Sequence, residues 1–137
     1  MRTIHRLLAT LTALLLGLGL VTATAPAASA EQVERQITIN PSEPKPNKFV
    51  IKGKISPSTG ERVNAVIERK LCKQDKDCGA KWSTWKKIRT SPKGRYSERV
   101  LGPGKGYKRA YYRVATKENK KFFAAVSDEV FIYKIVF

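Results

Sequence analysis

Two cysteines, Cys72 and Cys78, are the residues of this sequence best placed for covalent chemistry. An even pair in a chain with an export signal predicts a disulfide, because thiols oxidise outside the cytoplasm. Their spacing differs from the CxxC motif of thiol redox proteins, and two cysteines without histidine make a poor zinc site. We therefore expect a structural disulfide that closes a small loop between two strands, which contributes about 2 kcal/mol in the chain-entropy model.

The loop between these cysteines holds Asp75 and Asp77, which have the spacing of a DxD motif. Calcium takes roughly six to eight oxygen ligands, and Lys73 and Lys76 oppose a cation at this place. Elsewhere no two carboxylates are paired for glycoside hydrolysis, and no glycine loop opens a helix that could hold a phosphate. The sequence predicts neither a metal site nor a cofactor.

The only histidine, His5, lies within the first thirty residues. If those residues are removed, Ser/His catalysis, Cys/His catalysis and imidazole metal sites all lose their central residue. No other nucleophile is paired with a base. We predict that the protein is not an enzyme, with a small hydrolase that works without histidine as an alternative.

Cations interleaved with aromatic side chains are the main indication of a binding surface. On one face of a predicted strand, Arg109 and Arg113 flank Tyr111, so that cations could hold phosphates while a ring stacks. The same cations could form a solvated face that blocks aggregation between sheet edges. The candidate anion-binding residues are Lys86, Lys87, Lys105, Lys108, Arg109, Arg113, Lys117, Lys120 and Lys121, with Trp85 and Tyr111 as candidate stacking residues.

The overall charge favours the binding interpretation. The 137 residues include 27 Lys+Arg and 11 Asp+Glu, for a formal net charge of +16. Without residues 1–30, which hold Arg2 and Arg6, 25 basic and 11 acidic side chains remain, a net charge of +14. Solubility of a small domain needs a net charge of only about 2–8, and a larger excess concentrates polyanions. We expect an anionic cell-wall polymer, a lipid surface or an acidic protein as partner, and only unspecific binding of nucleic acid.

The first thirty residues have the three parts of a secretory signal. Arg2 and Arg6 form a positive start, Leu7–Val21 is an apolar run of 15 residues, and Ala28-Ser29-Ala30 has the small-x-small pattern of a cleavage site. The apolar run is shorter than the roughly 20 residues of a membrane span. We expect cleavage after Ala30, with Ala25 or Ala27 as alternatives, secretion, and no transmembrane segment in the remaining chain.

The remaining chain alternates apolar and polar residues with a period of two, which is typical of strands. No segment has the pattern of an amphipathic helix. Residues 31–47 predict an N-terminal strand and a Pro-rich extended connector, and residues 48–137 a single antiparallel β-sandwich of seven to eight strands, which we expect to be a monomer. The expected strands are residues 33–39, 49–55, 62–71, 82–89, 96–101, 109–116, 121–126 and 130–137.

A series of short motifs runs along residues 49–130. They are VIKGKISP at 50–57, GERV at 60–63, VIERK at 66–70, KWS at 81–83, GRYS at 94–97 and YRV at 112–114. This order resembles secreted actinobacterial Ig-like (fibronectin-III-like) β-sandwich modules, although the cysteine pair and the density of lysines depart from that pattern. The resemblance implies that Trp82 is structural, which leaves Trp85 as the surface candidate. It implies no activity, because such modules serve as spacers, adhesion units and binding appendages.

Two binding functions are consistent with these residues. The first is a non-catalytic module that binds an anionic extracellular or cell-envelope partner. The alternative is a protein-binding effector or enzyme inhibitor that presents the Cys72–Cys78 loop, because a preorganised loop binds at a lower entropic cost.

Overall fold

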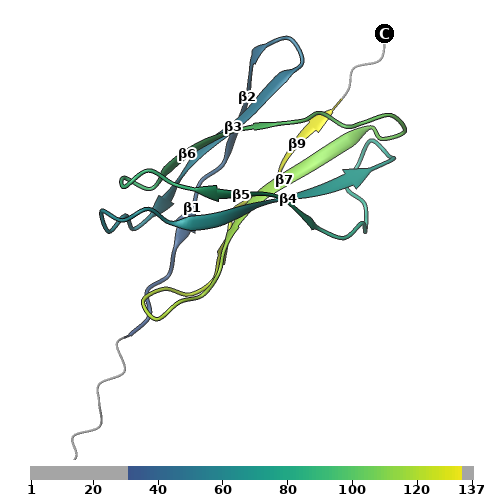
Figure 1. Ribbon diagram of the computed structural model, residues 1–137. Helices are drawn as coiled ribbons and strands as arrows, with labels where there is room; N and C mark the ends of the chain where they lie inside the picture. The colour runs from purple at the N-terminus through teal and green to yellow at the C-terminus, as the bar shows by residue number, and fades with distance from the viewer. Residues whose placement is uncertain (1–30, 134–137) are drawn as a thin grey trace, which may run out of the picture.

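The computed structural model describes residues 31–133, so the predicted signal and residues 134–137 lie outside the described part. Within this part the chain is all-β, with two antiparallel sheets and no helix (Figure 1). Consequently residues 31–133 also contain no helix that could cross a membrane. The nine strands are β1 (Gln36–Ile37), β2 (Asn40–Lys45), β3 (Lys48–Ser56), β4 (Asn64–Cys72), β5 (Ser83–Arg89), β6 (Arg95–Val100), β7 (Arg109–Thr116), β8 (Ala125–Val126) and β9 (Val130–Tyr133).

The first sheet is built around β3. Strands β1 and β2 pair in turn with one edge of β3, and β6 pairs with the other edge. In the second sheet the order is β5-β4-β7, and both β8 and β9 pair with the far edge of β7. The two sheets form a sandwich-like fold in which β2 and β9 lie near each other at one side.

The core lies between the two sheets and is filled by alternate residues of the strands. In β7, Ala110, Tyr112 and Val114 point into the core, while Tyr111 points to the opposite face. This is the period-two arrangement that the sequence predicts. The core residues are Ile37, Ile51, Ile55, Val63, Ala65, Ile67, Ile88, Tyr96, Val100, Ala110, Tyr112, Val114 and Ile132.

Two buried tyrosines connect the core to backbone carbonyls. The hydroxyl of Tyr96 donates to the carbonyl of Thr38 at 2.6 Å, and that of Tyr112 donates to the carbonyl of Leu101 at 2.6 Å. Each bond therefore satisfies a phenol that would otherwise be buried without a partner. Burial is the main reason why the pKa of each phenol is raised.

The Pro-rich stretch differs most from its expected form. Instead of a free connector, it forms β2, which pairs with β3 so that Pro41 lies opposite Ile51. All six residues of β2 are exposed. Proline can be accommodated here because β2 is an edge strand and half of its backbone groups need no partner in the sheet.

The predicted disulfide is confirmed: Cys72 and Cys78 are bonded, with their Cα atoms 5.8 Å apart. Cys72 ends β4, so the bridge closes the start of the long β4–β5 connection. The other expected strands are present, and two of them are much shorter than expected. The stretch 33–39 keeps only β1, 121–126 keeps only β8, and 130–137 is described only as far as the end of β9.

Candidate anion-binding cleft

Four of the nine predicted anion-binding residues lie together. Lys87, Lys117, Lys120 and Lys121 line a cleft of about 760 Å³ at one end of the second sheet. Its floor comes from the start of β4 and from β5, and one wall is the loop between β7 and β8. All four lysines are exposed, and no ion pair found within residues 31–133 involves them.

Two arginines that the sequence analysis did not single out complete the cleft. Arg35 comes from the segment before β1, and Arg62 from the loop before β4. Against these six cations the lining contains two carboxylates, Glu61 and Glu118. The arginines lie in segments distant from the lysines in sequence, so only the sheet topology brings them together.

Arg35 is held in place by an aromatic ring. Its guanidinium carbon lies 4.1 Å from the centroid of the Phe122 ring, and Phe122 itself is buried. Burial lowers the pKa of the Arg35 guanidinium, although arginine remains charged at neutral pH. Its buried Nε–H has no acceptor in the described part of the chain. The cation is thus fixed at the cleft, with donor capacity left over.

The loop that presents the three clustered lysines is ordered by side-chain hydrogen bonds. The Oδ1 of Asn119 accepts the backbone N–H groups of Lys121 and Phe122, each at 2.9 Å. Gln32 donates to Glu118 at 3.0 Å and to the carbonyl of Asn119 at 2.7 Å. These bonds fix the backbone from which the lysines project, so a ligand would not have to order the loop.

The other predicted cations lie elsewhere and mostly have partners. Lys86 of β5 forms an ion pair with Glu98 of β6, which joins the two sheets at one side. Lys105 and Lys108 lie in the β6–β7 loop at the opposite end, where the Nζ of Lys108 is 3.6 Å from an oxygen of Asp75. These residues do not extend the cleft.

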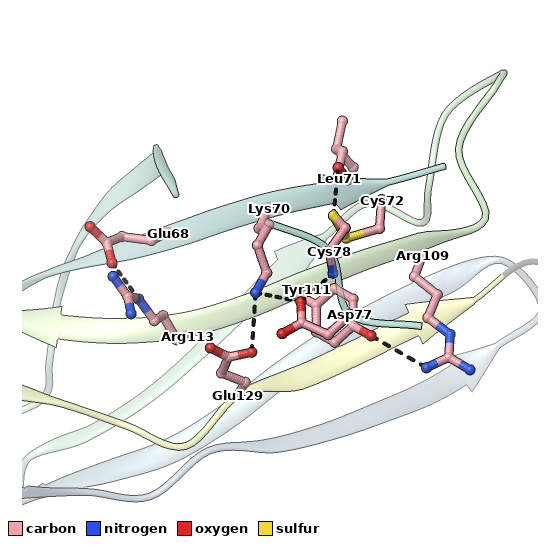
Figure 2. Close-up of polar contacts among 10 residues, drawn as sticks. All are labelled: Glu68, Lys70, Leu71, Cys72, Asp77, Cys78, Arg109, Tyr111, Arg113 and Glu129. Atoms are coloured by element: carbon pink, nitrogen blue, oxygen red, sulfur yellow. Dashed lines mark hydrogen bonds and ion pairs between the residues drawn. A yellow bond between two sulfur atoms is a disulfide. The ribbon is translucent and has the colours of Figure 1, made fainter. Parts of the chain in front are cut away.

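Arg109 and Arg113 lie on the outer face of the second sheet (Figure 2). The Nε of Arg113 donates to Glu68 at 2.6 Å, and its guanidinium lies 4.3 Å from the Trp82 ring centroid. Arg109 lies 4.5 Å from the Phe131 ring centroid. Both guanidinium groups are therefore engaged by neighbouring side chains.

The two candidate stacking residues are also occupied. Tyr111 is only 6 % exposed, and its hydroxyl accepts a hydrogen bond from Arg109 at 3.3 Å. Trp85 packs against the core, with its ring edge-to-face to Tyr112 at 6.5 Å between centroids. Trp82 instead lies on the outer face, which is the reverse of what the family resemblance implies.

A β-bulge explains the exchange of roles between the two tryptophans. Ile67 pairs with Lys86, whereas the next residue, Glu68, pairs with Thr84, so Trp85 is an extra residue in β5. A bulge changes which face of the sheet the following side chains occupy. Counted back from the buried Ile88, strict alternation would put Trp85 on the outer face, and the extra residue turns it toward the core instead.

The outer face also holds a buried lysine that the sequence analysis did not identify. Lys70 is 5 % exposed, and its Nζ lies 2.7 Å from Asp77 and 3.5 Å from Glu129 (Figure 2). Asp77 is also grouped with Cys72 and Cys78, the one cluster of metal-ligating residue types found within residues 31–133. The two sulfur atoms are bonded to each other and the carboxylate to Lys70, so this cluster does not fit a metal ion.

Comparison with known proteins gives no match to a family model, to a curated protein or to a solved structure. The chain's own geometry is then the basis for a functional conclusion. The cleft volume falls within the roughly 300–1,000 Å³ that is usual for ligand sites. Six of its lining residues are cations that form no ion pair within residues 31–133, and three of the six lie on an ordered loop, an arrangement that suits an anionic ligand.

Proposed function

We propose that this chain is a secreted, non-catalytic Ig-like module that binds a phosphate-bearing polymer of the cell wall in the basic cleft. One observation carries the proposal: six cations and only two carboxylates line a single cleft of about 760 Å³. A polymer with one negative charge per repeat can place several phosphates along such a cleft at once. Its binding would then be driven by release of counterions.

The absence of ion pairs at the loop lysines, in the described part of the chain, favours a role in ligand binding over a role in stabilising the fold. Lys117, Lys120 and Lys121 take part in no ion pair within residues 31–133, so a ligand would not have to break one. The nearest carboxylate on the loop, Glu118, already accepts a hydrogen bond from Gln32. A positive cleft with low-dielectric walls concentrates anions more strongly than the same lysines spread over a flat surface.

The Ig-like and secreted parts of the proposal have separate support. Strand β3 between β2 and β6, together with the order β5-β4-β7-β9, agrees with the strand arrangement of Ig-like sandwiches. The three-part signal in residues 1–30 supports secretion. The non-catalytic part rests on the position of His5, which would be lost with that signal.

The test measures binding of the secreted protein to purified wall polymer at about 50 and about 200 mM salt. We expect Lys117→Gln/Lys120→Gln/Lys121→Gln to weaken binding about tenfold at the lower salt, and to reduce the log–log salt slope by roughly 2, because each phosphate contact contributes roughly 0.7. A matched control, Lys45→Gln/Lys48→Gln/Lys105→Gln, removes the same charge at the other end. Equal losses in both variants would mean that net charge alone, and not the cleft, attracts the polymer.

A second candidate, a protein-binding effector, is favoured by the ordering of the Cys72–Cys78 loop. The loop is closed by the disulfide and held from outside by the bond between Asp77 and Lys70, while its residues 73–77 remain exposed. In that case Cys72→Ser/Cys78→Ser should abolish capture of a protein partner while the sandwich stays folded. Unchanged capture would exclude this loop as the binding element.

A further inference from the structure

A second cleft, at the end of the molecule opposite the basic cleft, is mainly apolar. Its volume is about 920 Å³, and its lining comes from the β2–β3 hairpin, the segment after β6 and β9. Three large apolar side chains on its rim are unusually exposed: Leu101 is 50 % exposed, Phe131 44 % and Tyr133 56 %. Exposed apolar side chains gathered around one groove mark an interaction site more often than scattered ones do.

The core leaves no room for these side chains. Along β9, Ile132 points inward and is buried, so Phe131 and Tyr133 must point outward. The groove is closely packed below Gly102, where an added Cβ would lie 3.1 Å from Phe49 and 3.8 Å from Ile132. Arg109 and Tyr111 cover part of the Phe131 ring, and the exposed remainder of Leu101, Phe131 and Tyr133 is available to a partner.

The loops beside this groove are positively charged. Lys45 and Lys48 flank the turn of the β2–β3 hairpin, and Lys105 lies in the β6–β7 loop; all three are exposed. The pairing of Phe49 with Val100 brings these two segments together at the same end of the first sheet. The groove lining holds one carboxylate, Glu43, which accepts the backbone N–H of Asn47 at 2.7 Å. The partner should therefore combine an apolar part with negative charge.

We propose that this end of the molecule docks onto a lipid bilayer that contains anionic lipids. Leu101, Phe131 and Tyr133 enter the boundary between headgroups and acyl chains, where aromatic side chains are favoured. The lysines of the two loops then contact the lipid phosphates. A bilayer presents both chemistries at once and requires no exact register between them.

A second copy of the chain fits this surface less well. Two copies without residues 1–30 would each bring a formal net charge of +14 to the contact, so their lysines would repel each other. The bilayer proposal does not depend on the wall-polymer proposal, because the two clefts share no lining residue.

The experiment measures co-sedimentation with vesicles of phosphatidylcholine, with and without phosphatidylglycerol, in the background Lys117→Gln/Lys120→Gln/Lys121→Gln. That background removes most of the charge of the other cleft. We expect binding to the anionic vesicles only. Leu101→Ser/Phe131→Ser/Tyr133→Ser should weaken this binding about tenfold, and the weakening should persist at about 200 mM salt, where charge attraction is screened. The matched control Val33→Ser/Phe123→Ser/Val126→Ser removes three equally exposed apolar side chains elsewhere and should bind normally.

Two further measurements keep the test decisive. Glu43→Gln should strengthen binding, because it removes the negative charge from the groove. In Tyr133→Trp, brominated lipid chains should quench the added tryptophan fluorescence. This measurement does not require the triple variant to fold. If added salt abolishes vesicle binding equally in all variants, charge attraction alone explains the binding, and the proposal is overturned. Dimerisation in sedimentation velocity that the triple serine variant abolishes would identify a second copy as the occupant, and would also overturn it.

Discussion

The Nζ of Lys70 lies 2.7 Å from the Oδ1 of Asp77, so the loop closed by the disulfide folds back onto the strand that precedes it. Lys70 is almost fully buried, with its ammonium 4.6 Å from the Trp82 ring centroid and 5.0 Å from that of Tyr111. Burial lowers the pKa of Lys70, but the hydrogen bond to Asp77 and the charge of Glu129 outweigh burial and raise it overall. One lysine thus connects the loop, the outer face and the segment before β9.

The stem of Lys70 should contribute more to stability than its charge. Lys70→Ala removes the apolar stem that packs on two rings, and we expect a loss of about 1–3 kcal/mol in the free energy of unfolding. Lys70→Met keeps the stem and should restore most of this loss. Urea unfolding of both variants measures the difference. Equal destabilisation by Met and Ala would show instead that the ion pairs dominate.

Alkaline pH should destabilise the fold. Burial raises the pKa of Tyr96 and Tyr112 above the usual value of about 10. Between the unfolded and folded pKa values the unfolded state releases protons that the folded state keeps. The stabilisation that comes from these two phenols is therefore fully present below about pH 10 and is lost as the pH rises further. The raised pKa of Lys70 acts in the same direction.

Urea unfolding between about pH 8 and pH 11 measures this alkaline loss. Tyr96→Phe should make the decline shallower, since one of the buried phenols is then absent. The variant will also be less stable at neutral pH, because the carbonyl of Thr38 loses its donor. If the unfolding free energy of Tyr96→Phe falls with pH as steeply as that of the unchanged protein, other titrating groups cause the alkaline loss.

Gly53, which belongs to the VIKGKISP motif, should tolerate no side chain. A Cβ at this position would overlap the carbonyl of Thr38 and the hydroxyl end of Tyr96. We expect Gly53→Ala to destabilise the protein by about 1–3 kcal/mol, the usual range for overpacking. Gly79→Ala is the matched control, because no atom lies within 4 Å of its added Cβ. Thermal unfolding of the two variants gives the comparison, and similar melting temperatures would contradict the close approach at Gly53.

The sequence predicts the strands well where one side of each strand is buried. Along β7 the alternation of Ala110, Tyr112 and Val114 with outward residues is regular, and the predicted bounds of this strand agree with the structure. β2 has no such pattern, because all its residues are exposed, and only pairing with β3 makes it a strand. Its two prolines, Pro41 and Pro44, therefore indicate an extended chain but not the strand with which it pairs.

The candidate cleft was predictable only in part. Lys117, Lys120 and Lys121 are close together in the sequence, so a local pattern can find them. Arg35 and Arg62 join them through pairing between distant segments, such as the bridge between Val33 and Phe122. Likewise, no local signal indicates that Lys70 is buried, because its cover comes from the loop that the disulfide folds over it.

The position of that loop should depend on the disulfide, and the pKa of Asp77 reports it. The hydrogen bond from Lys70 and the backbone N–H of Cys78 lower the pKa of this carboxyl. In Cys72→Ser/Cys78→Ser the loop gains conformational freedom, so we expect the pKa of Asp77 to rise toward its usual value and the protein to lose about 2 kcal/mol of stability. Titration of the Asp77 carboxyl carbon by NMR measures the first effect, and urea unfolding the second. Lys70→Met, with the disulfide intact, is the positive control and should raise the same pKa. If the pKa stays low in the double serine variant, the ion pair alone positions the loop and the disulfide only adds stability.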